Sequence, residues 1–96
     1  MEERTGTASL KVPGGKLIRV KIAYDSCIRK AEITGDFFIH PEGGISAIES
    51  SLEGLPVDSG EVSIAAAVQS VIDENNIQAI GIDAKSVAKA VRMAMQ

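Results

Sequence analysis

The sequence predicts an α+β domain, in which a three-stranded antiparallel sheet is covered on one face by about three helices. Apolar and polar residues alternate, as they do in strands, through most of the first 40 residues. Glycine and proline then interrupt this pattern, and apolar residues recur at helical spacing in the rest of the chain. Because 96 residues have room for one core, we expect a flexible N-terminus at residues 1–7 and a single domain at residues 8–96.

Strands are predicted at residues 8–12, 17–24 and 28–34, and the connections between them contain proline, glycine, aspartate and serine. In the second strand Arg19 and Lys21 lie between apolar residues, so one face of the sheet is expected to be buried and the other exposed to solvent. The predicted inward residues are Ile18, Val20, Ile22, Tyr24, Ala31, Ile33, Phe37 and Ile39.

Three helices are predicted in the second half of the chain. Asp58 and Glu61 have the spacing of a capping box before the second helix, and Asp83 is suited to cap the third. Between these two helices, residues 77–82 form a short apolar connector that could be extended. The apolar stripes are Ile45, Ile48, Leu52 and Leu55, then Ile64, Val68, Val71 and Ile72, then Ala84, Val87, Ala88, Val91 and Met95.

The composition argues against several kinds of function. With one cysteine, Cys27, and one histidine, His40, the chain has neither the pair needed for an internal disulfide nor the ligands of a zinc site. Three aromatic residues are too few for stacking on nucleic acid bases, and no apolar run approaches the ~20 residues that span a bilayer. We therefore expect a cytoplasmic protein with no metal and no nucleic acid or membrane partner, and no residue is predicted to be catalytic.

Charge is distributed unevenly along the chain. Residues 1–30 hold seven basic and three acidic groups, a balance of +4, whereas the remaining residues carry a balance of −7. This asymmetry favours contact between the N-terminal half and an anion, either a phosphate ester or an acidic protein surface. The alternative is that the charges only keep the strand edges soluble. If there is a partner surface, the exposed side of the sheet around Arg19 and Lys21 is its predicted place.

The segment Pro13-Gly14-Gly15-Lys16, between the first two strands, resembles a phosphate-binding loop only superficially. It lacks the first, spaced glycine, and Leu17 stands where such loops have serine or threonine. A tight turn in which the glycines adopt positive φ explains both glycines. It does not explain the lysine, so Lys16 and Lys11 remain candidates for contacting an anion on a partner.

The segment Gly35-Asp36-Phe37-Phe38 follows the third strand. Gly35 is interpreted as a bulge and Asp36 as a turn or cap residue. In extended backbone the two phenylalanines point to opposite faces, so we expect one in the core and the other exposed or covered by another protein. Asp36, Phe37 and Phe38 are therefore interface candidates.

Taken in this order, residues 11–20 (KVPGGKLIRV) and 33–38 (ITGDFF) resemble the C-terminal accessory domain of lipoate-protein ligases. Pro41-Glu42 and a helix containing Ile48, Glu49, Leu52 and Gly54 continue the resemblance, which covers roughly residues 9–96. The family's accessory domain shares its fold with sulfur-transfer scaffold proteins, which agrees with an order of strands first and helices later.

The resemblance implies a separate small subunit, as in bipartite archaeal ligases, because the large catalytic domain is absent from these residues. Such a subunit is non-catalytic and forms a heterodimer with the large subunit, in which ATP, Mg²⁺ and lipoate react to give lipoyl-AMP. Lipoyl-domain proteins, which then receive the lipoyl group, are indirect partners. The implied contact with the charged phosphates is Lys16, with Lys11 second, while Gly14 and Gly15 let the backbone approach.

Two other functions remain open from the sequence. The first is sulfur transfer or cluster scaffolding, in which Cys27 would carry a persulfide; the lack of further cysteines counts against a cluster. The second is a plain protein-interaction module. Exchanging Cys27 for serine separates the first of these from the ligase hypothesis.

Overall fold

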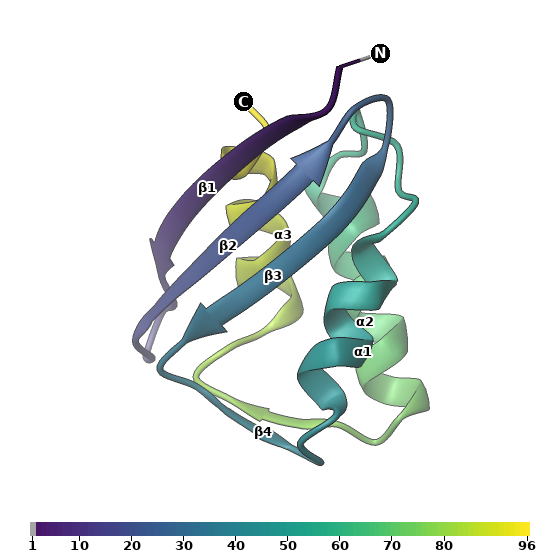
Figure 1. Ribbon diagram of the computed structural model, residues 1–96. Helices are drawn as coiled ribbons and strands as arrows, with labels where there is room; N and C mark the ends of the chain where they lie inside the picture. The colour runs from purple at the N-terminus through teal and green to yellow at the C-terminus, as the bar shows by residue number, and fades with distance from the viewer. Residues whose placement is uncertain (1) are drawn as a thin grey trace.

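The computed structural model describes residues 2–96, so Met1, which belongs to the predicted flexible N-terminus, lies outside the described residues. The α+β class, with its three-stranded antiparallel sheet and three helices, is confirmed (Figure 1). The elements in chain order are β1 (Arg4–Lys11), β2 (Leu17–Tyr24), β3 (Ile28–Gly35), β4 (Phe38–His40), α1 (Gly44–Leu52), α2 (Glu61–Glu74), β5 (Gln78–Ile80) and α3 (Ala84–Ala94).

The sheet has the order β1-β2-β3, with β2 in the middle and both pairs antiparallel. Its inward side is built from the alternation that the sequence displays: Ile18, Val20 and Ile22 are fully buried. Ala31 and Ile33 of β3 are buried beside them, as predicted. Phe37 and Ile39, which lie beyond β3, are half-buried at the edge of the same core.

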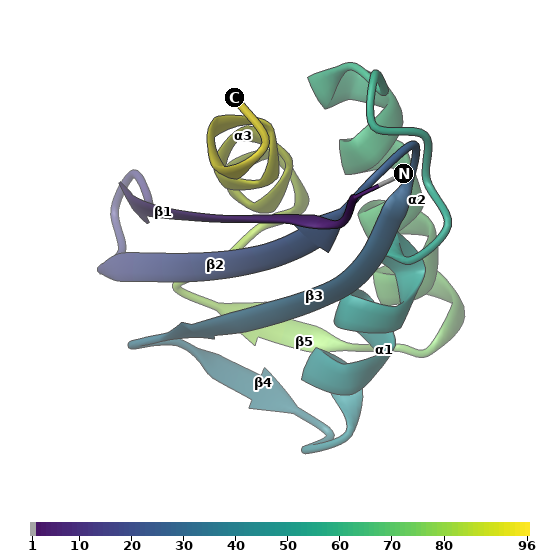
Figure 2. The ribbon, with the colours of Figure 1, turned by 45° about the horizontal axis from the view of Figure 1, so that its top comes forward.

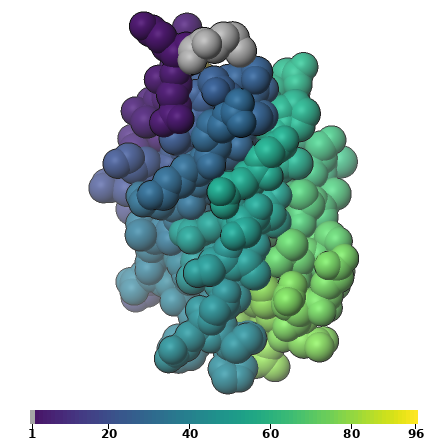
Figure 3. Space-filling model, turned by 45° about the vertical axis from the view of Figure 1, so that its right-hand side comes forward, coloured from purple at the N-terminus to yellow at the C-terminus, as the bar shows by residue number. Residues whose placement is uncertain are grey.

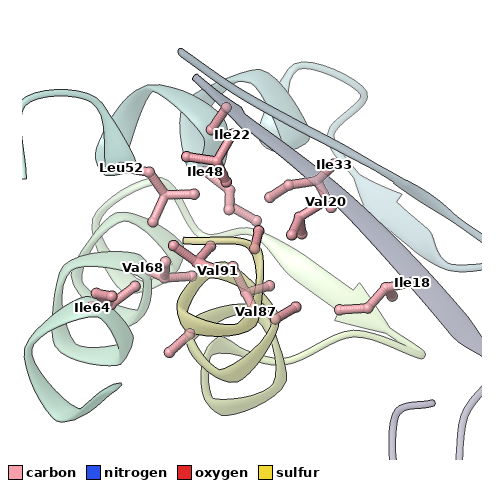
Figure 4. Packing of buried hydrophobic residues seen from close by; sticks show 14 of the residues in the cluster. Ile18, Val20, Ile22, Ile33, Ile48, Leu52, Ile64, Val68, Val87 and Val91 are labelled. Atoms are coloured by element: carbon pink, nitrogen blue, oxygen red, sulfur yellow. The ribbon is translucent and has the colours of Figure 1, made fainter. Parts of the chain in front are cut away.

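The three helices pack on one side of the sheet and leave the other side open (Figure 2). α3 lies against β1 and β2, α1 lies against β3, and α2 packs on α1 and α3 from outside. The space-filling view shows α1 lying between the sheet and α2 (Figure 3). The core between these layers is aliphatic, and Val20 of β2 lies in one cluster with Val87 and Val91 of α3 (Figure 4).

Helix caps are predicted correctly for α3 and wrongly for α2. Asp83 precedes α3, and its carboxylate accepts a hydrogen bond of 2.7 Å from the backbone N–H of Ser86. α2 begins at Glu61, and its N-cap is Gly60, which offers no side chain to the helix. The predicted capping box fails because Asp58 lies two residues before this cap, in a separate turn whose Ser59 hydroxyl donates to the Pro56 carbonyl.

β1 begins earlier than the sequence predicts. Residues 4–7, which we expected to be flexible, pair with residues 21–24 of β2 and belong to the strand. The apolar alternation is missing there because the inward position is Gly6, where a Cβ atom would overlap the backbone carbonyl of Ala94 in α3. The close approach of α3 thus requires glycine at a position where most strands carry a large apolar residue.

A second, two-stranded sheet joins β4 to β5. Phe38 pairs with Ile80 and His40 with Gln78 in antiparallel register. The expectation that residues 77–82 are extended is thereby confirmed for β5. This sheet ties the segment after β3 to the connection between α2 and α3, at the end of the molecule where β3 finishes (Figure 1).

Candidate functional site

The loop between β1 and β2, residues 12–16, forms a tight turn and is called the hairpin loop below. The Gly15 N–H donates to the Val12 carbonyl at 2.8 Å, and the Val12 N–H donates to the Lys16 carbonyl at 3.0 Å. Pro13 and Gly14 are the central residues of the first turn, and Gly14 has a φ of +74°, as a type II turn requires. Gly14 is thus required by the turn itself.

Gly15 has a different role, because it touches another part of the same chain. A Cβ atom at Gly15 would lie 3.2 Å from both the Cα and the carbonyl oxygen of Gly81. Gly81 in turn has a φ of +82° and packs against the backbone of Asp36 and Phe37. Gly15 thus makes a close backbone contact with Gly81 that the sequence analysis did not predict, and this contact joins three segments that are distant in sequence.

These three segments line a shallow pocket of about 330 Å³, called the loop-end site below. It brings together the two sequence motifs, PGGK after β1 and GDFF at the end of β3. The Nζ atom of Lys16 lies 3.7 Å from Oδ2 of Asp36, with both side chains about three-quarters exposed. An ion pair this exposed is weak and leaves Lys16 free to move. The lining residues are Gly14, Gly15, Lys16, Asp36, Phe37, Phe38, Ile80 and Gly81.

The two phenylalanines divide as the alternation predicts. Phe37 is half-buried against the core, whereas Phe38 is 72% exposed. Its cross-strand neighbour Ile80 is 71% exposed, so two large apolar side chains stand together in solvent. Gly35 is the last residue of β3, and the irregularity in strand register lies at Ala23/Tyr24 instead, so the bulge predicted at Gly35 is wrong.

The other predicted site residues lie on a different surface. Arg19 and Lys21 are exposed on the side of the sheet opposite the helices, and Lys11 is exposed on the same side, at the end of β1 next to the hairpin loop. The Nε atom of Arg19 donates to the Ser9 hydroxyl across the strands at 3.4 Å. The structure thus separates the candidates into the loop-end site and a basic sheet face. Sequence reasoning missed Ile80 and Gly81, because nothing local links them to residues 14–16.

Cys27 lies in the turn between β2 and β3, at the other end of β2 from the hairpin loop. Its N–H donates to Oδ1 of Asp25 at 3.2 Å, and its backbone forms a bridge with Pro56. The Asp25 carboxylate accepts hydrogen bonds from the Arg29 side chain and from the Cys27 N–H. These two contacts, and the one with Arg29 above all, hold the pKa of Asp25 below its usual value. Among residues 2–96, no three acidic, histidine or cysteine side chains gather as a metal site.

No family model matches this chain, and no curated protein matches it in sequence. In structure, it is similar to a chain from an archaeal lipoylation system of Thermoplasma acidophilum, which consists of a bipartite lipoate protein ligase and its E2 lipoyl domain. The TM-score is 0.77 and the sequence identity 25%, over 95% of this chain and 98% of the other.

This similarity extends over almost the full length of both chains. It connects the present fold with a lipoylation system, which is the context that the two sequence motifs indicate. Within residues 2–96, none of the helices combines the length and the apolar character needed to cross a membrane.

Proposed function

We propose that this chain is the small, non-catalytic subunit of an ATP-dependent lipoate-protein ligase, which a large subunit requires to convert lipoate and ATP into lipoyl-AMP. The observation that carries the proposal is the structural similarity, over nearly the full length, to a chain of a lipoylation system that consists of a bipartite ligase and its E2 lipoyl domain. The meeting of the KVPGGK and GDFF motifs in one site supports it independently, because residues that resemble one family are then neighbours in space.

The loop-end site has the features of a surface that docks on another protein. Phe38 and Ile80 form an exposed apolar pair, and Lys16 and Asp36 stand beside it as polar neighbours. Apolar anchors surrounded by polar groups are typical of stable interfaces. In the proposed heterodimer this end of the molecule contacts the large subunit next to its nucleotide site.

Lys16 is the residue proposed to act on the chemistry. In adenylation a carboxylate oxygen of lipoate bonds to the α-phosphorus of ATP, and pyrophosphate leaves with the electrons of the broken bond. Negative charge grows on the departing phosphates, and a lysine presented by the hairpin loop stabilises it. The ion pair with Asp36 is weak enough to be exchanged for such an anion.

Intact-mass measurement of a reconstituted lipoylation reaction tests this function. The mixture contains the cognate large subunit, this chain, a lipoyl-domain acceptor, lipoate, ATP and Mg²⁺. The proposal predicts that the acceptor gains a lipoyl group only when this chain is present, and that the mass of this chain stays unchanged. Acceptor modification at the same rate without this chain overturns the proposal. So does lipoylation of Lys16, since this chain would then be the acceptor.

Exchanging Lys16 for alanine tests the proposed phosphate contact. Pyrophosphate release by the pair should slow at least ~10-fold, since one positive charge that offsets the developing negative charge is lost. The fold should be unaffected, because Lys16 is exposed and makes only the weak pair with Asp36. Lys89→Ala is the matched control, because Lys89 is also exposed but lies on α3. Equal rates of pyrophosphate release for the two variants would mean that the hairpin loop serves only as a structural turn.

A further inference from the structure

The side of the β1–β2–β3 sheet opposite the helices, called the open face below, is not used by the proposed function. Side chains alternate along each strand, so the residues between the buried ones point to this side. On β2 these include Arg19 and Lys21, and both are exposed. All three helices pack on the opposite side, so the open face stays in contact with solvent (Figure 2).

The open face is strongly basic in a protein that is acidic as a whole. Its outward positions within the three strands hold Lys11, Arg19, Lys21 and Lys30, and the carboxylate among them is Glu32, 3.6 Å from Lys30. The balance is +3, whereas the chain carries −3, so the other residues sum to −6. Arg19 and Lys21 are two residues apart on one strand, or about 7 Å. That spacing is shorter than the screening length in physiological salt, so their fields add.

The side chains next to Arg19 on the neighbouring strands are short, since it lies opposite Ser9 and Thr34. Lys21 lies between Thr7 and Glu32, and the exposed Leu17 lies opposite Lys11. A flat partner can therefore approach Arg19 closely. The aromatic residues lie elsewhere: Tyr24 is buried, and the two phenylalanines belong to the loop-end site. Without stacking side chains on this face, an acidic protein surface fits it better than a nucleic acid does.

The two surfaces differ in the kind of contact they favour. The loop-end site has an exposed apolar pair, which suits a lasting association, whereas a charged face raises the rate of encounter and permits rapid release. In lipoyl transfer the acceptor protein must arrive and leave in every turnover. We propose that the open face is the docking surface for an acidic face of the acceptor protein. This inference rests on the proposed function, since it assigns the second protein that the heterodimer must bind.

Charge reversal on the open face tests the inference. The variant is Arg19→Glu with Lys21→Glu, and the control is Lys85→Glu with Lys89→Glu, which makes the same change of charge on exposed positions of α3. With the reconstituted pair, the KM for a lipoyl-domain acceptor should rise about 10-fold at low salt, and the difference should shrink at high salt. The rate of pyrophosphate release without acceptor should equal that of the wild type. The control should leave the KM for the acceptor unchanged.

Several results would overturn the inference while leaving the proposed function intact. One is an unchanged KM for the acceptor in the Arg19/Lys21 variant. Another is weaker binding of the large subunit, which would assign the open face to that partner. A change in the chain's own oligomeric state would assign the face to a second copy. Conversely, if the wild-type pair releases no pyrophosphate at all, the proposed function itself fails.

A second measurement does not depend on ligase activity. In NMR titration of the isolated, isotope-labelled chain with unlabelled acceptor, amide shifts should concentrate on β2 and the facing positions of β1 and β3. Shifts confined to the hairpin loop and β4, or no shifts at millimolar acceptor, would contradict the proposed docking surface.

Discussion

Replacing Phe38 with alanine is expected to weaken binding of the large subunit by roughly 100-fold. A phenylalanine side chain has roughly 200 Å² of surface, and 72% of Phe38 is exposed in the free chain. An interface that covers this surface buries about 140 Å², worth about 3.5 kcal/mol at 25 cal/mol per Å². Alanine retains part of that area, so we expect a loss of about 3 kcal/mol.

The same exposure predicts that the variant folds normally. Little of Phe38 is buried within the chain, so its removal should cost no more than about 1 kcal/mol of unfolding free energy. Titration calorimetry with the large subunit measures the dissociation constant, and thermal unfolding of the chain alone measures stability. Val62→Ala is the matched control, since Val62 is 84% exposed on α2 and lies with Ala65 and Lys85 on another surface than the loop-end site. If a folded Phe38→Ala variant bound within about twofold of the wild type, the docking role of this end would be refuted.

Three further variants, the first with a matched control, test the account of the fold and its alternatives. Gly6→Ala should cost about 3 kcal/mol of stability in a denaturant titration, because the new Cβ overlaps the Ala94 carbonyl. The control is Gly43→Ala, which should change stability by less than ~1 kcal/mol, because a Cβ at Gly43 meets open space. The lowered pKa of Asp25 means that its carboxylate stabilises the fold above its usual pKa of 3.8 and loses this effect as the pH falls through the lowered value. The Asp25→Asn variant should therefore have a lower melting temperature than the wild type at pH 7 and the same melting temperature in strong acid. Cys27→Ser should leave pyrophosphate release by the pair unchanged, and loss of activity would instead favour sulfur transfer.

The parts of the fold that the sequence predicts are those governed by local periodicity. β2 alternates over its whole length, and each predicted inward residue is buried. Asp83 caps α3 because the side chain, the turn and the helix are adjacent in the chain. The start of β1 could not be predicted in the same way. Glycine at position 6 is explained by the close approach of Ala94 in α3, which lies at the other end of the sequence.

The residues of the candidate site also divide into those with a local signal in the sequence and those without one. The hairpin loop and the segment around Asp36 were each recognisable from their own residues. Their association depends on Gly81, which follows β5 and touches both. Likewise, Ile80 becomes part of an apolar patch only because β5 pairs with β4 opposite Phe38. Pairing between segments so distant in sequence is determined by the packed core, which no local pattern encodes.

Formation of lipoyl-AMP in the absence of acceptor tests the central claim most directly. Pyrophosphate release is measured with lipoate, ATP and Mg²⁺ for the cognate large subunit alone, for this chain alone, and for the two mixed. The account predicts release only in the mixture, saturating at one chain per large subunit. Equal release by the large subunit alone would contradict it.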